Sequence, residues 1–260
     1  MAAPELSEHI LLEGLHTQFV GRVLHFFEEI PSTQDAAREA AHAEAPEGAV
    51  FLTDEQTAGR GRLGRRWEAP AGSSLLLSIV LRPTEELYPK LLMVGALAAA
   101  LAIEETTGLR VDLKWPNDVL LRDKKVGGVL VEGEFQGTDL LFALMGIGIN
   151  VNLNPAVFTE ALYPATSLSH EAGSPVSRLA LAHSLLRHLE RTLLQARAGE
   201  RVDRLWRARL VTLDKQVQVR AGNDVIEGLA EDVDADGSLL VRRSDGSLTT
   251  IVAGDVTLQR

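Results

Sequence analysis

The order of the predicted elements indicates an α+β protein, with a mixed domain over residues 1–210 and a small β domain over residues 211–260. In the first part strands and helices are interspersed, and two long apolar arms at 126–135 and 140–149 predict an antiparallel hairpin. From Lys215 onward the pattern changes to short alternating strands, separated by Asp-Gly and Ala-Gly-Asn-Asp turns. Such a run is typical of a small antiparallel barrel or sandwich.

The larger domain is expected to contain helices as well as strands. Ser32 and Thr33 can cap the first helix, and Gly108 follows the second where a left-handed residue commonly ends a helix. Residues 57–72, which we name the Gly–Arg loop, carry four glycines and four arginines without an apolar period. In chain order we expect a strand at 23–30, a helix at 34–45, strands at 49–53 and 74–81, a helix at 89–107, strands near 110–114 and 118–121, the hairpin, and a helix at 177–198.

Composition and charge exclude several classes of function. The chain has 260 residues, of which 26 are Lys or Arg and 36 are Asp or Glu, so its formal net charge is −10, and it has no cysteine. A thiol nucleophile, a disulfide, Cys-ligated zinc and an iron–sulfur cluster are therefore excluded. The acidic balance argues against a general nucleic-acid binder. The N-terminal residues do not have the pattern of a signal peptide, and the longest nearly uncharged stretch, residues 91–103, is too short to span a bilayer. We therefore expect a cytoplasmic protein and no membrane segment.

The Gly–Arg loop carries the most informative pattern. Gly59, Gly61 and Gly64 satisfy the dinucleotide fingerprint GxGxxG, but Pro70 and Gly72 follow, so no helix can continue there to face a pyrophosphate. The Walker pattern is also missing. What remains is a glycine-hinged loop that can close over a polyanion, with guanidinium groups suited to phosphate or carboxylate; a solvated basic loop is the plain alternative. Its arginines are Arg60, Arg62, Arg65 and Arg66.

Further segments place polar residues at the ends of predicted strands. The pentapeptide Lys-Trp-Pro-Asn-Asp at 114–118 ends in two oxygen ligands of the kind that Mg²⁺ takes, although a packed Asn-Asp turn has the same pattern. Lys125 stands at the mouth of a strand before two glycines, which let a ligand approach the backbone. The strand at 146–152 ends in asparagine. The seven histidines show no metal-ligand spacing, and no Ser–His–Asp arrangement is recognisable.

Taken in this order, the motifs resemble those of biotin–protein ligases. They are Ser32-Thr33-Gln34, Glu55 to Trp67, Lys114 to Asp118, Lys125 to Glu132 and Gly146 to Asn152. The resemblance runs from about residue 24 to residue 152 and more loosely through the β domain. It implies a catalytic domain like that of class II aminoacyl-tRNA synthetases, with a mixed or antiparallel sheet, and then a small SH3-like β-barrel. At position 34 the chain has Gln where the family usually has Asn. Gln keeps the amide group but has a longer side chain.

The resemblance implies a ligase that works in two steps. The carboxylate of biotin attacks the α-phosphorus of ATP to give biotinyl-5′-AMP and pyrophosphate, and a lysine of a carrier protein then takes the biotin and expels AMP. The implied biotin-binding residues are Ser32, Thr33, Gln34, Gln56, Arg60, Gly61, Arg62 and Lys125. The implied ATP- or adenylate-binding residues are Arg62, Arg65, Trp67, Lys114, Asn117 and Asn150, with Asp118 and Asn117 beside Mg²⁺. The implied catalytic residues are Lys114, Lys125 and Arg62.

Two rival functions stay open at this point. A lipoate–protein ligase would share the fold and the adenylation chemistry, and a non-catalytic biotin or adenylate sensor would share the pocket. About twenty residues precede the first strand, which together with the net charge of −10 predicts a monofunctional ligase without DNA binding. The expected partner is a biotin carboxyl carrier protein, such as the acetyl-CoA carboxylase subunit. Family members often pair subunits at exposed strand edges, but no interface signature in the sequence decides for a homodimer.

Overall fold

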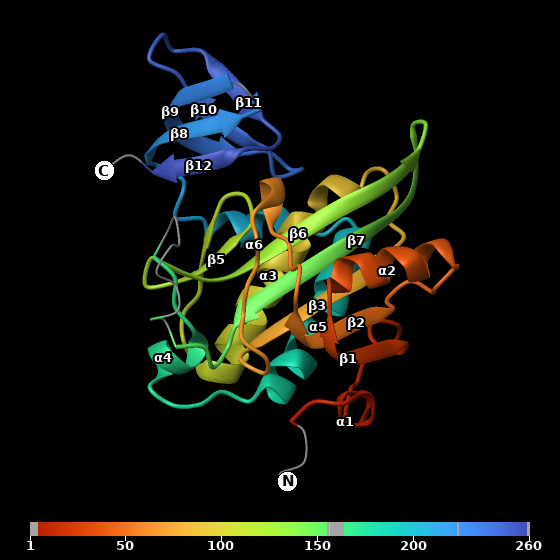
Figure 1. Ribbon diagram of the computed structural model, residues 1–260. Helices are drawn as coiled ribbons and strands as arrows, with labels where there is room; N and C mark the ends of the chain where they lie inside the picture. Colours follow the sequence, from red (N-terminus) through yellow and green to blue (C-terminus); the bar gives the residue numbers. More distant parts are fainter. Residues whose placement is uncertain (1–4, 155, 157–163, 223, 259–260) are drawn as a thin grey trace.

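The computed structural model describes residues 5–154, 156, 164–222 and 224–258. Over these residues the strands form one 7-stranded and one 5-stranded sheet, which lie in two separate parts of the molecule (Figure 1). The larger part carries helices on both faces of its sheet, and the smaller part consists of strands near the C-terminus. The α+β architecture expected from the sequence is therefore confirmed, including the antiparallel sheet at the C-terminal end.

The seven-stranded sheet is mixed, as expected. β1 runs parallel to β2, and the other neighbouring strands are antiparallel. Because parallel strands need a crossover, the chain passes from β1 to β2 through α2 (Thr33–His42). The predicted hairpin forms the long central pair, in which Gly128 lies opposite Gly148. The order is β1 (Leu24–Ile30), β2 (Val50–Gln56), β3 (Ser74–Leu81), β7 (Asp139–Asn150), β6 (Lys124–Gln136), β5 (Asp118–Leu121) and β4 (Asp112–Lys114).

Helices cover both faces of this sheet and bury two separate apolar clusters. On one face α3 (Leu91–Thr107) packs against β6 and β7, and α5 (Arg178–Arg197) packs against α3. On the other face α2 lies over β2, β3 and β7, where Ala37 and Ala41 join a small cluster around Phe51. Figure 1 shows α2 in front of the sheet and α3 and α5 behind it. Strand β3 is buried along its whole length because both of its faces are covered.

Most predicted elements end within about three residues of their expected positions. The first helix stops at His42 rather than at residue 45, because Glu44 has a positive φ of 61°. Gly108 ends α3 with a φ of 70°, as predicted. The apolar pattern does not indicate the short helices α1 (Glu8–Leu12), α4 (Leu168–Ala172) and α6 (Val202–Arg207). Over the described part of the chain, no helix is both long enough and apolar enough to cross a bilayer.

The C-terminal part is a five-stranded antiparallel sheet, whose buried apolar residues are continuous with the main core of the larger part. Its strands follow the order β11 (Leu248–Ile251), β10 (Leu239–Arg242), β9 (Asp224–Val233), β8 (Gln216–Ala221) and β12 (Asp255–Leu258). The core residues alternate along the strands, as the period-2 pattern predicts; they are Val217, Val219, Ala230, Leu239, Val241, Ile251 and Val256. Because β12 pairs with β8 rather than with β11, the last strand returns across the sheet.

A buried tryptophan joins the two parts. Trp115 is 1% exposed, its indole Nε1 donates to the carbonyl oxygen of Gly237 at 2.8 Å, and its backbone N donates to Thr212 Oγ1 at 2.9 Å. Leu210 still forms a β-bridge with Leu113 of the large sheet, so the chain leaves the larger domain only after this point. The boundary expected at residue 210 stays a prediction.

Candidate functional site

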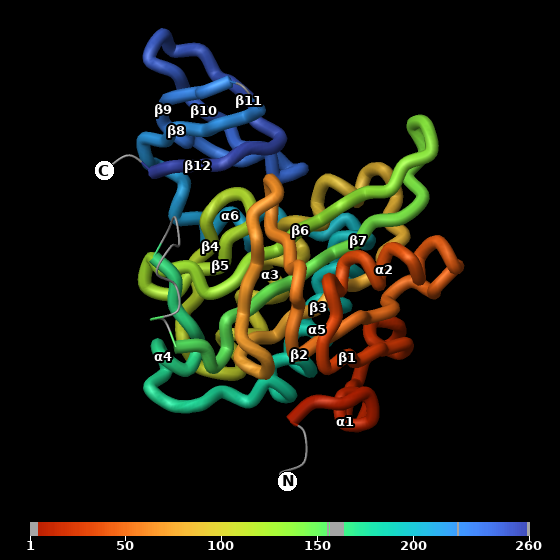
Figure 2. Tube along the Cα trace, viewed as in Figure 1, coloured from red at the N-terminus to blue at the C-terminus, as the bar shows by residue number. Residues whose placement is uncertain are grey.

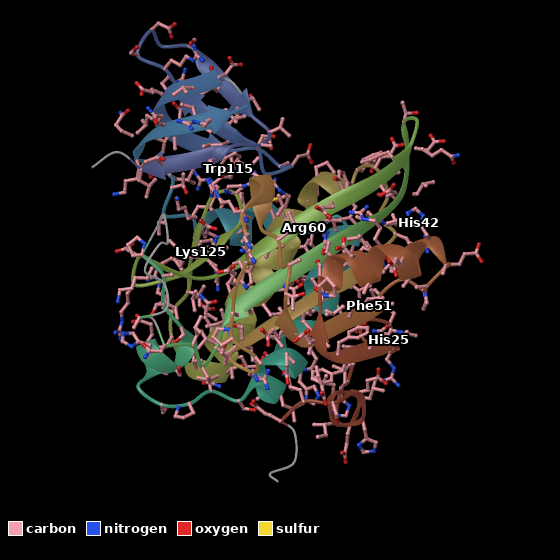
Figure 3. The ribbon with its side chains drawn as sticks, in the orientation of Figure 1. His25, His42, Phe51, Arg60, Trp115 and Lys125 are labelled. Atoms are coloured by element: carbon pink, nitrogen blue, oxygen red, sulfur yellow. The ribbon has the colours of Figure 1, made fainter. Side chains whose placement is uncertain are left out.

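One large cleft opens where β3, β6 and β7 meet the Gly–Arg loop, with the start of β12 at its rim. Its volume is about 1190 Å³. The cleft brings together every residue for which the sequence predicts a role: Ser32, Thr33, Gln34, Gln56, Arg60, Gly61, Arg62, Arg65, Trp67, Lys114, Asn117, Asp118, Lys125 and Asn150. Figure 3 labels Arg60, Trp115 and Lys125, which come from the loop, the turn before β5 and the start of β6.

Part of the cleft lining is a hydrogen-bonded polar network, which we name the polar floor: the buried Thr33, Gln34 and Ser78 and the half-buried Gln56. Gln56 Oε1 accepts from the backbone N of Thr33 at 2.9 Å and from its hydroxyl at 3.1 Å. The Thr33 hydroxyl lies 2.8 Å from Ser78 Oγ, which donates to Gln34 Oε1 at 2.8 Å. Ser78 is only 1% exposed, so its bonds to Thr33 and Gln34 form away from solvent, whereas the bonds of the half-buried Gln56 are partly buried.

Gln34 extends the polar floor to the neighbouring strand. Its Nε2 donates to Glu132 Oε2 at 3.2 Å, and Arg38 Nη2 binds the same carboxylate at 2.8 Å. The side chain of Gln34, which is longer than the usual Asn, therefore reaches from α2 to β6. A Cβ at Gly146 would lie 2.9 Å from Gln34 Oε1, so glycine on β7 makes room for the amide. Ser32 caps α2 through its hydroxyl, which accepts from the backbone N of Gln34, as predicted.

The Gly–Arg loop contacts the rest of the cleft through Arg60 and Arg62, although most of its residues are exposed. Arg60 forms an ion pair with Asp35 of α2, and the hydrogen bond to Asp35 raises the pKa of the Arg60 guanidinium. Arg62 Nη1 donates to Asn117 Oδ1 at 3.1 Å. Burial lowers the pKa of the Arg62 guanidinium, and the negative charges of Asp255 and Asp118 partly oppose this shift. The plain alternative of a solvated basic loop is therefore wrong for Arg62, whose charge is held inside the site.

Trp67 closes the loop against the sheet. A Cβ at Gly148 would lie 2.7 Å from Trp67 Cε2, so the indole packs directly on the β7 backbone. The Nζ of Lys125 lies 5.8 Å from the centre of the indole ring, within the range of a cation–π contact. The indole Nε1 is buried and has no hydrogen-bond partner among the residues that the structure describes. A buried donor without a partner is costly, so this N–H is available to a ligand.

The cationic side of the cleft is built on the turn before β5 and the start of β6. Lys125 forms an ion pair with Asp118, and Lys114 is buried nearby in the cleft wall. Asn117 donates from Nδ2 to the Val129 carbonyl oxygen at 2.9 Å, which fixes its Oδ1 toward Arg62. Lysine and arginine charges therefore surround one end of the cleft, where two anionic groups could be held close together.

The oxygen ligands present fit a magnesium ion that arrives on phosphates. Asp118 brings a carboxylate, which pairs with Lys125, and Asn117 brings an amide oxygen, which accepts from Arg62, so each would share its oxygen with the ion. In the described ranges no three His, Asp or Glu side chains stand together as a metal cluster. Mg²⁺ typically takes one or two protein carboxylates and completes its shell with phosphates and water. The predicted pair therefore suits a phosphate-borne ion better than a resident metal.

Comparison with known proteins shows the same two-part organisation. The model of the biotin/lipoate A/B protein ligase family matches residues 26–150, and that of the biotin protein ligase C terminal domain matches residues 212–258. The bifunctional ligase/repressor BirA of Bacillus subtilis is 34% identical over 259 residues, which cover 98% of this chain and 79% of that protein. The biotin--[acetyl-CoA-carboxylase] ligase of Mycobacterium tuberculosis is 34% identical over 269 residues, covering 97% and 96%.

The chain belongs to the biotin protein ligase family. Among solved structures, the biotin protein ligase of Aquifex aeolicus in complex with biotin and ATP has a TM-score of 0.78 and 30% identity, covering 92% of this chain and 99% of that one. The biotin protein ligase of Leishmania major in complex with biotinyl-5-AMP has a TM-score of 0.61 and 28% identity, with 89% and 99% covered. The resemblance stated from the motifs is confirmed.

For this member of the biotin protein ligase family, motif reasoning missed residues that meet the site from elsewhere in the fold. Ser78 lies on β3 and donates to Gln34. The signal that could have indicated it is a polar residue within an apolar strand that is buried throughout. Thr166 accepts from Asn150 Nδ2 through its carbonyl oxygen at 3.1 Å. Gly254 and Asp255 come from the C-terminal domain and contact the Gly–Arg loop. These positions carry no local motif.

Proposed function

We propose that this chain uses ATP to activate biotin as biotinyl-5′-AMP and transfers biotin to a lysine of a biotin carboxyl carrier protein. The observation that carries the proposal is the single cleft that joins a buried polar floor to a cationic end under one closing loop. Relatives solved with biotin and ATP, or with biotinyl-5-AMP, have the same fold over about nine-tenths of this chain.

In the first step two anions must meet. At about 4 Å and an effective dielectric constant of about 20, two unit charges repel by about 4 kcal/mol. Arg62, Lys114 and Lys125 would offset this repulsion and stabilise the charge that grows on the phosphoryl oxygens as the bond to pyrophosphate breaks. Mg²⁺ on the ATP phosphates, held by Asp118 and Asn117, would neutralise further charge there. No protein nucleophile is needed, because the biotin carboxylate attacks the α-phosphorus itself.

In the second step a neutral lysine amine of the carrier attacks the mixed anhydride and AMP leaves. Until the carrier arrives, the anhydride must be shielded from water, which the Gly–Arg loop can do because it already packs over the cleft through Trp67 and Arg62. The name of the Mycobacterium tuberculosis relative supports an acetyl-CoA carboxylase subunit as the carrier. A cytoplasmic location and a homodimer stay predictions.

The polar floor favours biotin over lipoate. The ureido ring of biotin offers N–H donors and a carbonyl acceptor, whereas the dithiolane ring of lipoate offers neither. The hydroxyl and amide groups of the polar floor bond to one another and can exchange such bonds for bonds to the ureido ring, whereas the dithiolane ring can take part in no such exchange.

One experiment separates the ligase from its rivals. The chain is incubated with ATP, Mg²⁺ and either biotin or lipoate, and ligand-dependent pyrophosphate release is measured; a carrier domain is then added and its modification is followed by mass spectrometry. We expect pyrophosphate with biotin and a carrier that gains one biotinyl group. Release with lipoate alone would identify a lipoate ligase, and binding of biotin without any release would identify a sensor.

A further inference from the structure

The C-terminal domain reaches the cleft through residues 252–255, which we name the β11–β12 turn. The Gly254 carbonyl oxygen accepts from Arg62 Nη2 at 3.3 Å, and the Asp255 carboxylate forms an ion pair with Arg65. Both arginines belong to the Gly–Arg loop of the catalytic domain. Figure 2 shows this loop, in orange, rising from the sheet to meet the C-terminal domain, in blue. The two domains therefore touch at the loop itself as well as at Trp115.

We propose that Gly254 and Asp255 are positioning residues that hold the Gly–Arg loop closed, so that the C-terminal domain controls how long activated biotin stays in the cleft. The consequence for activated biotin rests on the proposed function, but the contact between loop and turn does not. Asp255 acts through Arg65, and Gly254 acts through Arg62, so neither needs to touch a substrate.

Close packing sets the position of the β11–β12 turn. A Cβ at Gly254 would lie 2.9 Å from the Arg220 carbonyl oxygen and 2.9 Å from Val219 Cγ1, so a side chain there would push the turn away from β8. The next residue, Asp255, is in register with Arg220 in the ladder between β8 and β12. The groups that contact the loop are thus fixed to the C-terminal sheet through the backbone of β12 and move with the domain.

The tip of the Gly–Arg loop has little packing of its own. Leu63 at the tip is 70% exposed and has a positive φ of 57°, which costs a non-glycine residue conformational energy. Gly61 and Arg65 pair across the tip, with Gly61 N donating to the Arg65 carbonyl oxygen at 2.7 Å. Such a short strained loop stays closed only where other residues hold it. Arg62 and Arg65 beside the tip reach the β11–β12 turn. These contacts add to those that Asn117 makes with Arg62 and Asp35 makes with Arg60 within the catalytic domain.

A purely electrostatic role for Asp255 makes a different prediction. A carboxylate at the rim of a cationic cleft repels ATP, so its removal would tighten ATP binding and lower the KM for ATP without affecting the loop. If Asp255 instead holds the loop, its removal lets the loop open more often, and both protease access to the loop and escape of the intermediate increase. The two roles therefore differ in what they change.

The test compares Asp255→Asn with Asp255→Glu and with Glu231→Gln. Glu231 pairs with Arg242 within the C-terminal domain, so Glu231→Gln removes one negative charge from the same domain away from the loop. The first measurement is the rate of tryptic cleavage within residues 60–66 of the ligand-free chain, whose arginines are natural sites. The second is the rate at which preformed labelled biotinyl-AMP is released during a chase with unlabelled biotin and ATP.

We expect Asp255→Asn to raise both rates about two- to fivefold, the range for loss of a half-exposed ion pair, while Asp255→Glu and Glu231→Gln stay near the wild type. Unchanged cleavage in Asp255→Asn, or an equal rise in Glu231→Gln, would overturn the proposal. Faster cleavage with unchanged release would overturn the control over activated biotin, and unchanged cleavage with a lower KM for ATP would favour the electrostatic role. If the wild type makes no biotinyl-AMP, the proposed function fails, and the cleavage rates still decide whether the turn holds the loop.

Discussion

At the residue scale, the cations of the cleft are held in place by partners before any substrate arrives. Lys125 pairs with Asp118, Arg65 with Asp255, and Arg62 donates to Asn117. An arginine or lysine that is already oriented loses little side-chain entropy when an anion replaces or joins its partner. The paired carboxylates therefore serve the site by keeping long, flexible side chains near the geometry that substrates require.

Replacing Lys125 by alanine should abolish most of the first step. The variant loses a charge-assisted contact worth about 1.5–3 kcal/mol, so ATP–pyrophosphate exchange should fall about ten- to a hundredfold. Lys124→Ala is the matched control, because this neighbouring lysine faces Glu171 and does not line the cleft. Normal exchange in Lys125→Ala would show that this lysine does not act on the reacting groups.

Replacing Arg62 by glycine should leave partial synthesis of biotinyl-AMP but let the intermediate escape. The change removes the hydrogen bonds that join the loop both to Asn117 and to Gly254, while Lys114 and Lys125 stay in the cleft. Retention of labelled biotinyl-AMP after rapid gel filtration measures the effect. Retention equal to that of the wild type would contradict a shielding role for the loop.

Ser78 should determine how well the polar floor binds biotin. Ser78→Ala removes the hydroxyl that joins Thr33 to Gln34, so the KM for biotin should rise about five- to tenfold, equivalent to about 1–1.4 kcal/mol, with kcat little changed. Ser74→Ala on the same strand is the control, since its buried hydroxyl has no partner within the described residues. Equal effects of the two substitutions would point to packing of β3 instead.

At the scale of elements, α3 packs directly against the central strands β6 and β7 of the large sheet. It is apolar on nearly all sides because it lies between the sheet and α5. A Cβ at Gly95 would lie 2.8 Å from Met145 Sδ and 2.8 Å from Val129 Cγ1, so glycine lets the helix approach β6 and β7 closely. That approach keeps β6 and β7 in place under the cleft. The sequence predicts the helix, whereas the need for glycine at this position becomes visible only in the packing.

The contact between α3 and α5 should make stability depend on acid pH. The Arg187 guanidinium and the Ser184 hydroxyl hold the pKa of Glu105 down to about 2. Because the folded protein favours the ionised carboxylate, this stabilisation is complete above the ordinary pKa of about 4.5 and is lost as the pH falls toward about 2. Glu105 is largely exposed, so solvent screening limits the contribution to about 1 kcal/mol or less.

Glu105→Gln therefore should lower the free energy of unfolding at pH 7 by about 1 kcal/mol or less, and the difference from the wild type should shrink as the pH approaches 3. Urea unfolding at the two pH values measures it. Glu200→Gln is the control, since Glu200 accepts a hydrogen bond from the neutral amide of Gln195. A difference that stays constant between pH 7 and pH 3 would rule out the carboxylate charge as its cause.

At the scale of the whole molecule, the net charge of −10 and the arrangement of arginines argue against DNA binding. Arg60, Arg62 and Arg65 are committed to Asp35, Asn117 and Asp255 around the cleft and do not form an open basic face. We expect no sequence-specific binding to duplex DNA of a biotin-operon promoter in a gel-shift assay at physiological salt. A retarded band that survives excess nonspecific DNA would contradict this prediction.

Local sequence predicts most of the fold and much of the site, because the signals are local. Period-2 runs predict the strands, and Gly108 marks the end of α3. The short helices escape prediction because five or six residues carry too little apolar period. The motif residues of the cleft are predicted because each stands in a recognisable segment, whereas Thr166 meets Asn150 only through the folding of distant chain segments.

The absence of cysteine, the acidic charge and the order of the motifs are properties of the chain itself; they exclude thiol chemistry and fit a reaction in which the substrate carries the activated group. The partners of the arginines are decided by folding. Arg62 and Arg65 meet Gly254 and Asp255 across about 190 residues of chain. No local pattern encodes such a meeting, because it depends on how β12 packs against β8 and on how Trp115 holds the C-terminal domain over the cleft.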